Sequence, residues 1–398
     1  MPDKVLLLSY AFPPIAAPES FLSAKAMSDI PGYETDVVCA DADANALSQD
    51  DSLKEYVQRR FKKIIAVNPP LLLKWLPKNT PFLCQIPDYF IYLNNNLLHY
   101  FDSLDLSGYK AVITWSQWHS IHLAGLWIKK KIPSLKWFVH FSDPWIDNPF
   151  MHNSGPQYFI NKFLEKSVIH KSDAIFFTSP ETIQLVMKKY SSLLKGKVYY
   201  IPHSFDRDLY DTSLAPSRGL YVIRSLGSFY GHRSPRPIFE AIEKIGRETP
   251  ELLEGVSFEI VGSLGPYKNL LNNYPFAKEI VCIVGSVSYL DSLRLMQTAN
   301  CLLVIDAPGQ TSVFFPSKLV DYIGAGRFIF AISPEGATLR IIKEIGGVNT
   351  NPLNIEETTR ALRDILLKRP SSLPTKNYNY EKKNVNILRK NIFDSLLR

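Results

Sequence analysis

The stretch CLLVIDAPGQTSVFFPSKLVDYIGAGRFIFAIS, residues 301–333, begins and ends with a short apolar run. Both runs are rich in β-branched and aromatic residues, which is typical of strands that are buried on both faces of a sheet. Between them, Pro316-Ser317 indicates the start of a helix with Lys318 in its first turn. A strand, a helix and a second strand in this order predict two parallel strands joined by a crossover helix.

Apolar runs of the same kind recur along the chain, with helical stretches between them. We expect strands in the first half at 4–10, 35–40, 63–67, 111–116, 136–142, 174–179 and 197–202, and in the second half at 221–229, 258–263, 280–286, 301–306 and 328–333. The polar stretch DTSLAPSRG (211–219) separates the two sets and indicates a linker. Strands that alternate with helices predict parallel sheets that helices cover on both faces.

The sequence therefore predicts an α/β protein of two Rossmann-like, doubly wound domains that face each other across a cleft. The first domain would span 1–210 and the second 219–379. The tail, 380–398, carries apolar residues at helical spacing, so we expect an amphipathic helix that packs back on the first domain. Ligands of open α/β sheets bind beyond the carboxyl ends of the strands, so the residues that follow the strands are the candidates for a site.

Composition and charge narrow the class of protein. The 398 residues are 46% hydrophobic and 21% charged, as in globular proteins, and no window offers the roughly 18 uncharged apolar residues that a membrane span requires. The net charge of +7 fits phosphorylated ligands, an acidic membrane surface or nucleic acid. Nucleic acid is disfavoured because the basic residues are scattered. Cys39, Cys84, Cys282 and Cys301 lack metal-ligand or redox spacing, which favours a reducing cytoplasm.

Two predicted helix starts in the second half carry a cation. Gly227 belongs to a turn after a strand, Arg233 follows it, and Ser234 with the next proline indicates the helix start. The free N–H groups of a helix N-terminus, together with Arg233 or Lys318, suit a phosphate, and Asp321 would accept hydrogen bonds from sugar hydroxyls. Each feature has an ordinary alternative, namely a surface Arg beside a cap or an i,i+3 Lys–Asp ion pair. Two such starts in one domain favour a diphosphate.

In the first half, WFVHFSDPWIDNPF (137–150) places His140 inside a strand and Asp143 at its end. Asp143 would orient a hydroxyl or act as a base, or it merely forms the turn before a proline. His140 is either a second catalytic candidate or a histidine of the core. The loop AFPPIAAPES (11–20) is stiffened by three prolines and would shape the floor of the cleft.

Several common motifs do not support another chemistry. Asp41-Ala42-Asp43 matches the Asp-x-Asp of metal-dependent sugar transferases, but the two-domain layout does not suit that fold. The sequence has no GxGxxG after the first strand, no GKS/T phosphate loop, no GxSxG and no HExxH. None of these motifs therefore points to a metal site or to a dinucleotide cofactor.

Seven stretches carry a resemblance that covers nearly the whole chain. They are LLLSYAFPP, PDYFIYLNNNLLHYF (87–101), AVITWSQWHSIHLAGLWIKK, KWFVHFSDPWIDNPF, LGSFYGHRSPRPIFEAI, GSVSYLDSLRLMQTANCLLVID and FFPSKLVDYIGAGRFIFAISPEG. Together they resemble bacterial family 4-like glycosyltransferases of the GT-B fold, the kind that build surface polysaccharides.

The resemblance implies that the second domain holds a nucleotide-diphosphate sugar and the first domain holds the acceptor. Arg233 and Lys318 would bind the diphosphate, Asp321 the ribose, and the backbone of 284–287 the base. The full set that the resemblance implies is Gly227, Ser228, Arg233, Val284, Ser317, Lys318 and Asp321 for the donor, Asp143 and His140 for catalysis, and Pro13, Pro14, His122 and Trp145 on the acceptor side.

One position departs from the family pattern. Many relatives have two glutamates eight positions apart; Asp321 fits the second, but Val313 occupies the first. The stereochemical outcome therefore stays open: retention by a same-face route is favoured, and inversion with Asp143 as the base is the alternative.

The sequence as a whole predicts a cytoplasmic, metal-independent glycosyltransferase. Its acceptor would be a glycan or a lipid-linked glycan of bacterial surface polysaccharide synthesis, such as lipopolysaccharide or capsule. The basic charge and the aromatic segment 71–93 suggest peripheral contact with the inner face of the membrane. Two alternatives remain: a sugar-nucleotide epimerase of the same shape, and a non-catalytic scaffold that binds sugar or nucleotide.

Overall fold

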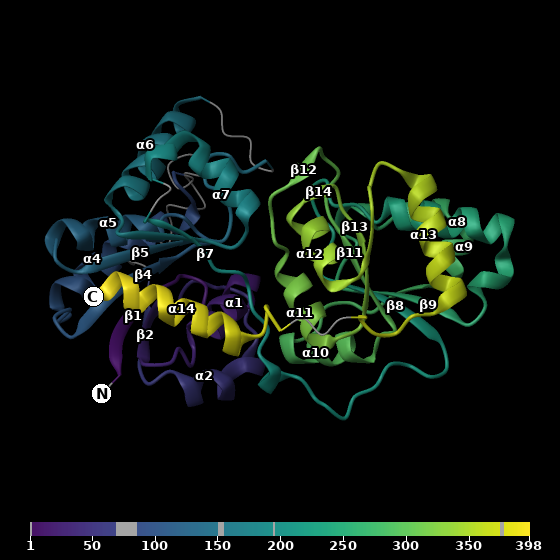
Figure 1. The fold of residues 1–398 in the computed structure, drawn as a ribbon, viewed down its shortest axis with the longest axis horizontal. Coiled ribbons are helices and arrows are strands. Elements are labelled where there is room, and N and C mark those ends of the chain that lie inside the picture. The colour runs from purple at the N-terminus through teal and green to yellow at the C-terminus, as the bar shows by residue number, and fades with distance from the viewer. Residues whose placement is uncertain (1, 69–85, 150–154, 194–195, 375–377) are drawn as a thin grey trace. The chain divides into compact units, whose positions relative to one another are not determined.

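The computed structural model describes residues 2–68, 86–149, 155–193, 196–374 and 378–398 (Figure 1). The chain forms two compact units. The first comprises Met1–His203 and Lys382–Arg398, and the second comprises Ser204–Glu381. Cys84 and most of the aromatic segment 71–93 lie outside the described residues.

The first unit is built on a seven-stranded parallel sheet with the order β3-β2-β1-β4-β5-β6-β7. Its strands are β1 (Asp3–Leu8), β2 (Tyr33–Ala40), β3 (Ile64–Val67), β4 (Tyr109–Trp115), β5 (Lys136–Phe141), β6 (Ala174–Phe177) and β7 (Val198–Tyr200). Its helices include α1 (Pro18–Met27), α2 (Lys54–Arg60), α4 (Leu93–Ser103), α5 (Ile121–Lys131), α6 (Pro156–Lys171) and α7 (Pro180–Met187). The strand order reverses between β1 and β4, which is the position where open α/β sheets bind ligands.

The C-terminal helix α14 (Lys382–Leu397) belongs to the first unit. Phe393 is fully buried, and its ring packs against those of Phe138 and Phe176 in the sheet. Arg389 donates a hydrogen bond to the carbonyl of Ala26 at the end of α1, at 2.6 Å. The apolar and polar faces predicted for this tail therefore both have partners in the first unit.

The second unit is built on a six-stranded sheet with the order β10-β9-β8-β11-β13-β15, and every pair is parallel. Its strands are β8 (Tyr221–Leu226), β9 (Val256–Val261), β10 (Val281–Ile283), β11 (Cys301–Ile305), β13 (Phe328–Ile332) and β15 (Val348–Thr350). Its helices include α8 (Arg236–Glu248), α9 (Pro275–Ile280), α10 (Tyr289–Thr298), α11 (Ser317–Ala325), α12 (Ala337–Ile345) and α13 (Ile355–Lys368). The order reverses here between β8 and β11.

The structure confirms the predicted fold class of two parallel-sheet α/β domains. All twelve predicted strands are present. Every residue of β11 and β13 is buried, whereas β3, β7 and β10 at or near the sheet edges are only partly buried. Three short strands were not predicted: β15 at the sheet edge, and β12 (Thr311–Ser312) with β14 (Glu335–Gly336), which form a separate parallel pair. The β12–β14 pair requires glycine at 336, where φ is +129° and a Cβ would lie 2.0 Å from the carbonyl oxygen of Ser312.

Among the residues that the structure describes, no helix is long and apolar enough to cross a membrane.

Candidate functional site

The reversal point of the second sheet has an open backbone turn. Gly227 follows β8 with φ at +96°, and a Cβ at Gly262 would lie 2.8 Å from the carbonyl carbon of Gly227. Two strand ends therefore approach each other with no side chain between them. A Cβ at Gly227 would lie 3.6 Å from Lys318 Nζ, so the ammonium group lies directly beside this turn. Ser228, also a predicted donor residue, is exposed beside them and accepts a hydrogen bond from the Ser263 N–H at 3.2 Å.

Lys318 stands in the first turn of α11, as predicted, since the helix begins at Ser317. Its Nζ donates a hydrogen bond to the carbonyl of Leu226, the last residue of β8, at 2.9 Å. Burial and the neighbouring charge of Arg233 lower the pKa of Lys318 to about 7, against a smaller opposing effect of Asp306. The negative charge of Asp306 therefore does not offset the burial of the ammonium group and the repulsion by Arg233.

Arg233 lies next to Lys318 in the loop before α8. This helix begins at Arg236, one residue later than predicted, and the Ser234 hydroxyl accepts the Arg236 N–H at 3.2 Å. The Arg233 guanidinium lies 3.5 Å from Asp306 Oδ1 and 5.3 Å from the centre of the Tyr230 ring. Its Nε atom is buried and has no hydrogen-bond partner among the described residues. This donor is therefore available to an acceptor from a ligand.

Asp306 is a site residue that the sequence reasoning missed. It directly follows β11, is buried, and accepts hydrogen bonds from Ser333 at 3.1 Å and Thr338 at 2.7 Å. These contacts fix the carboxylate that holds Arg233. The signal was present in the sequence, because Asp306 ends the run CLLVID at a strand next to the reversal point.

Asp321 lies one turn after Lys318, but its carboxylate already has partners. The Tyr289 hydroxyl donates to both carboxylate oxygens, at 3.1 and 3.0 Å, and the Tyr210 hydroxyl lies 3.5 Å from Oδ1. Asp321 is only 5% exposed. A sugar hydroxyl could therefore donate to this carboxylate only beside the tyrosine hydroxyls or in place of one of them.

An apolar surface follows β10 at one edge of the second sheet. Ile283, Val284 and Val287 are each about two-fifths exposed, and the Val284 N–H donates to the carbonyl of Ile260 at 2.9 Å. A flat apolar group could pack on this edge, which is the position predicted for the nucleotide base.

In the first unit, the ends of β4 and β5 and the start of α1 bring two carboxylates together. Glu19, in the first turn of α1, accepts hydrogen bonds on Oε2 from Trp115 Nε1 and from the Ser142 hydroxyl, both at 2.8 Å. Burial and, second, the charge of Asp143 raise the pKa of Glu19 to about 8. Glu19 is therefore mostly protonated near pH 7. Its only mark in the sequence is its place at a helix start.

His140 lies behind this pair rather than beside it. Its ring stacks on Trp115 with the centres 3.4 Å apart, and it is 3% exposed. Burial, followed by the charge of His203, lowers its pKa well below the ordinary value. The ring is therefore neutral at physiological pH.

The remaining residues predicted for the acceptor side are mostly buried. The His122 ring packs against Phe141 and Trp145, and the Trp145 indole donates to Asn161 at 3.2 Å. Pro13 is buried and Pro14 is half-buried. The structure brings Glu19 and Asp143 close enough to interact, with His140 behind them, and it buries His122 and Trp145 in the core.

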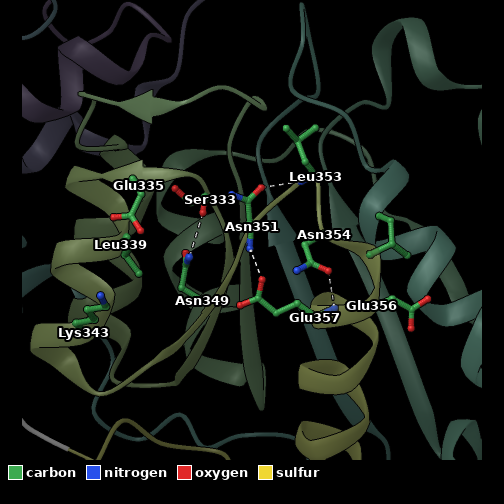
Figure 2. A pocket seen from close by; sticks show the side chains of 11 residues that line it. Ser333, Glu335, Leu339, Lys343, Asn349, Asn351, Leu353, Asn354, Glu356 and Glu357 are labelled. Carbon is green, nitrogen blue, oxygen red and sulfur yellow. Dashed lines mark hydrogen bonds between the residues drawn. The ribbon is translucent and has the colours of Figure 1, made fainter.

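A cavity in the described part of the second unit lies apart from the predicted residues (Figure 2). It has a volume of about 930 Å³, lies beyond β13 and β15, and is lined by α12 and the start of α13. Its lining is polar and includes Asn349, Asn351, Asn354 and Glu335. It contains none of the predicted donor residues, but Ser333 on its wall donates to Asp306 and so connects it to the Arg233 cluster.

Within the described ranges, no group of three or more His, Cys, Asp or Glu side chains is arranged to hold a metal ion. The thiols of Cys39, Cys282 and Cys301 are free.

Comparison with known proteins gives the fold a name. No family model and no curated protein matches the chain. Solved structures similar to it include sucrose-phosphate synthase from Thermosynechococcus elongatus, with a TM-score of 0.70, 14% identity and 99% of each chain covered. Anabaena HepE in complex with UDP has a TM-score of 0.65 at 14% identity, covering 99% of this chain and 100% of its own. WaaG, a glycosyltransferase of lipopolysaccharide biosynthesis, has a TM-score of 0.65 at 14% identity, covering 98% and 99%. The chain therefore has the GT-B fold of two Rossmann-like domains.

Proposed function

We propose that the protein is a glycosyltransferase that takes its sugar from a nucleotide-diphosphate sugar. The observation that carries the proposal is the pair of cations Arg233 and Lys318 at the reversal point of the second sheet. Both are partly desolvated, the Arg233 Nε lacks an acceptor, and the backbone at Gly227 is open beside them. A diphosphate supplies the missing acceptors and the missing charge.

The exposed apolar edge after β10 supports the same donor. A nucleoside base would pack on Ile283, Val284 and Val287, while its diphosphate lies at Arg233 and Lys318. Similar structures include Anabaena HepE with UDP and with UDP and glucose, which lends support to a nucleotide sugar. The two cations would stabilise the charge that develops on the leaving diphosphate, and no metal ion is required for that step.

We place the acceptor at the first unit, beside Glu19 and Asp143. Because the raised pKa of Glu19 keeps its proton in place near pH 7, we assign the role at the acceptor hydroxyl to its neighbour Asp143. Asp143 would orient the acceptor hydroxyl or take its proton, and the neutral His140 ring would hold Trp115 against Glu19. Although Val313 stands where many relatives have an acid, we favour retention by a same-face route, in which the leaving diphosphate helps to deprotonate the acceptor; inversion with Asp143 as the base is the alternative.

We further propose the finer setting that the sequence suggests. The acceptor is a glycan or lipid-linked glycan of bacterial surface polysaccharide, such as lipopolysaccharide or capsule, and the enzyme works at the cytoplasmic face of the inner membrane. The similarity to WaaG and to the lipopolysaccharide galactosyltransferase WaaB supports this setting.

A panel of nucleotide sugars tests the donor assignment. A ligand that binds only the folded protein raises its melting temperature, so the cognate donor should stand out from the panel. Lys318→Ala should abolish that rise, whereas Lys268→Ala, which removes an exposed lysine of the same unit, should retain it. No rise with any nucleotide sugar in the wild type would contradict the proposal.

The alternatives give different products with the same donor. An epimerase converts the donor alone, without an acceptor. A scaffold binds the nucleotide weakly or not at all and leaves the donor intact even when the acceptor is present. Release of the nucleoside diphosphate that depends on the acceptor identifies a transferase.

A further inference from the structure

Helix α6 of the first unit presents an aromatic surface that no described residue covers. Phe159 and Phe163, one turn apart, are each 69% exposed, and Ile160 is 42% exposed. The opposite side of the helix is buried through Asn161, Glu165, Val168 and Ile169. Single exposed apolar residues are ordinary on protein surfaces, but two phenylalanines in contact range on one helix face form a patch.

The charges on the same face of α6 have one sign. Lys162, Lys166 and Lys171 are exposed, and Lys162 Nζ lies 5.7 Å from the centre of the Tyr158 ring. The acid of this helix, Glu165, is buried and bonds to Lys189 Nζ at 2.8 Å and to the N–H of Ile146 at 3.1 Å. The outward face therefore combines aromatic rings with positive charge and presents no acid of its own.

The exposed aromatic rings and lysines together indicate what kind of surface α6 binds. A protein partner with an apolar groove would match the two rings but would gain nothing from lysines on both sides of them. A bilayer of anionic phospholipid matches both, because the rings enter the boundary between head groups and acyl chains while the lysine stems lie along the surface and their ammonium groups meet phosphate.

We propose that α6 docks on an anionic phospholipid bilayer, with Phe159 and Phe163 at head-group depth and Lys162 and Lys166 against lipid phosphates. The inference deepens the proposed function, because a lipid-linked acceptor lies in such a bilayer. Lipid binding can be measured without donor or acceptor, so failure here leaves the transferase proposal standing, and failure of transfer leaves α6 docking standing.

Flotation of the full chain with vesicles tests the docking surface. Vesicles of phosphatidylglycerol mixed with phosphatidylcholine should carry the protein, vesicles of phosphatidylcholine alone should carry far less, and added salt should weaken binding. Phe159→Ser with Phe163→Ser should reduce the partition coefficient at least about tenfold, since it removes the buried apolar area. Lys162→Gln with Lys166→Gln should reduce it roughly fivefold for each lysine.

Matched controls come from the second unit. Leu367→Ser removes a side chain that is 63% exposed on α13, and Lys268→Gln removes an exposed lysine; both should float as the wild type does. Melting temperatures of all variants, measured without vesicles, establish that each is folded.

Three results would overturn the proposal. The first is no binding of the wild type to phosphatidylglycerol vesicles. The second is equal binding by the wild type and both α6 variants. The third is a wild-type dimer that Phe159→Ser with Phe163→Ser converts to a monomer, because the patch would then belong to an interface between copies of the chain.

Discussion

The pH dependence of donor binding should follow the titration of Lys318. Its pKa of about 7 lies far below the ordinary value of 10.5, because the site is desolvated and Arg233 is near. A diphosphate brings two negative charges to the ammonium group and raises its pKa in the complex. Binding above pH 7 therefore takes up a proton, and the affinity falls as the pH rises.

The structure gives the size of the effect. The difference from 10.5 corresponds to about 5 kcal/mol against the charged form, as an upper bound. In the free protein Lys318 is mostly charged at pH 6 and about one part in a hundred is charged at pH 9. If the bound diphosphate holds the pKa above 9, the dissociation constant of the donor rises about 100-fold between pH 6 and pH 9.

Calorimetric titration at several pH values measures this change directly. The ligand should be the sugar donor itself, because its diphosphate is esterified at both ends and does not titrate in this range. Repeating the titration in buffers with different enthalpies of ionisation counts the protons taken up. Lys318→Arg is the control, since arginine keeps its charge throughout and its pH dependence should be nearly flat.

Lys318→Ala should weaken donor binding by roughly 1.5–3 kcal/mol at pH 6, where most of the lysine in the wild type is charged. A wild-type affinity that is constant between pH 6 and pH 9, with no proton uptake, would refute the assignment of Lys318 to the diphosphate. So would wild-type affinity in Lys318→Ala.

Three further predictions concern the carboxylates. Asp143→Asn should reduce turnover about 100-fold or more and leave donor affinity nearly unchanged; an unchanged rate would reduce Asp143 to a turn residue. Glu19 keeps its proton in the folded chain between pH 4.5 and about 8 but loses it in the unfolded chain, so its contribution to stability falls as the pH rises through this window. Glu19→Gln should therefore raise the melting temperature at pH 8 more than at pH 5, and an equal change at both would argue against a protonated Glu19. Asp321→Asn should weaken binding of the nucleoside diphosphate while inorganic diphosphate binds as before; equal losses for both ligands would indicate a role in folding of α11.

The sequence predicted those parts of the fold that depend on local pattern. Buried apolar runs such as 301–306 and 328–333 can be recognised because parallel strands are apolar on both faces. The start of α11 at Ser317 followed from the proline before it. In contrast, β12, β14 and β15 are two or three residues long and partly polar, so nothing in their composition distinguishes them from loops.

Of the candidate site, the sequence predicted the residues that follow strands but not the contacts that those residues make. Arg233 and Lys318 follow strands in the sequence, so their convergence could be expected from strand order. The partners of Asp321 could not, because Tyr210 is 111 residues away from it. The burial of His122 and Trp145 could not be predicted either. The polar end of such a side chain can face water or a buried partner, and here the partners are Thr114 for His122 and Asn161 for Trp145.

The return of the chain to the first unit through α14 makes the second unit an insertion within the first. Phe205 donates its N–H to the carbonyl of Tyr380 at 2.9 Å, so the two ends of the second unit lie side by side. The segment 204–381 can therefore be expressed as one continuous piece, and a short linker could close the first unit over its absence. During synthesis, the second unit can therefore complete its fold before the first unit does. The second unit can fold while the first still lacks α14, and the core around Phe138 and Phe176 closes only when Phe393, near the end of the chain, has left the ribosome.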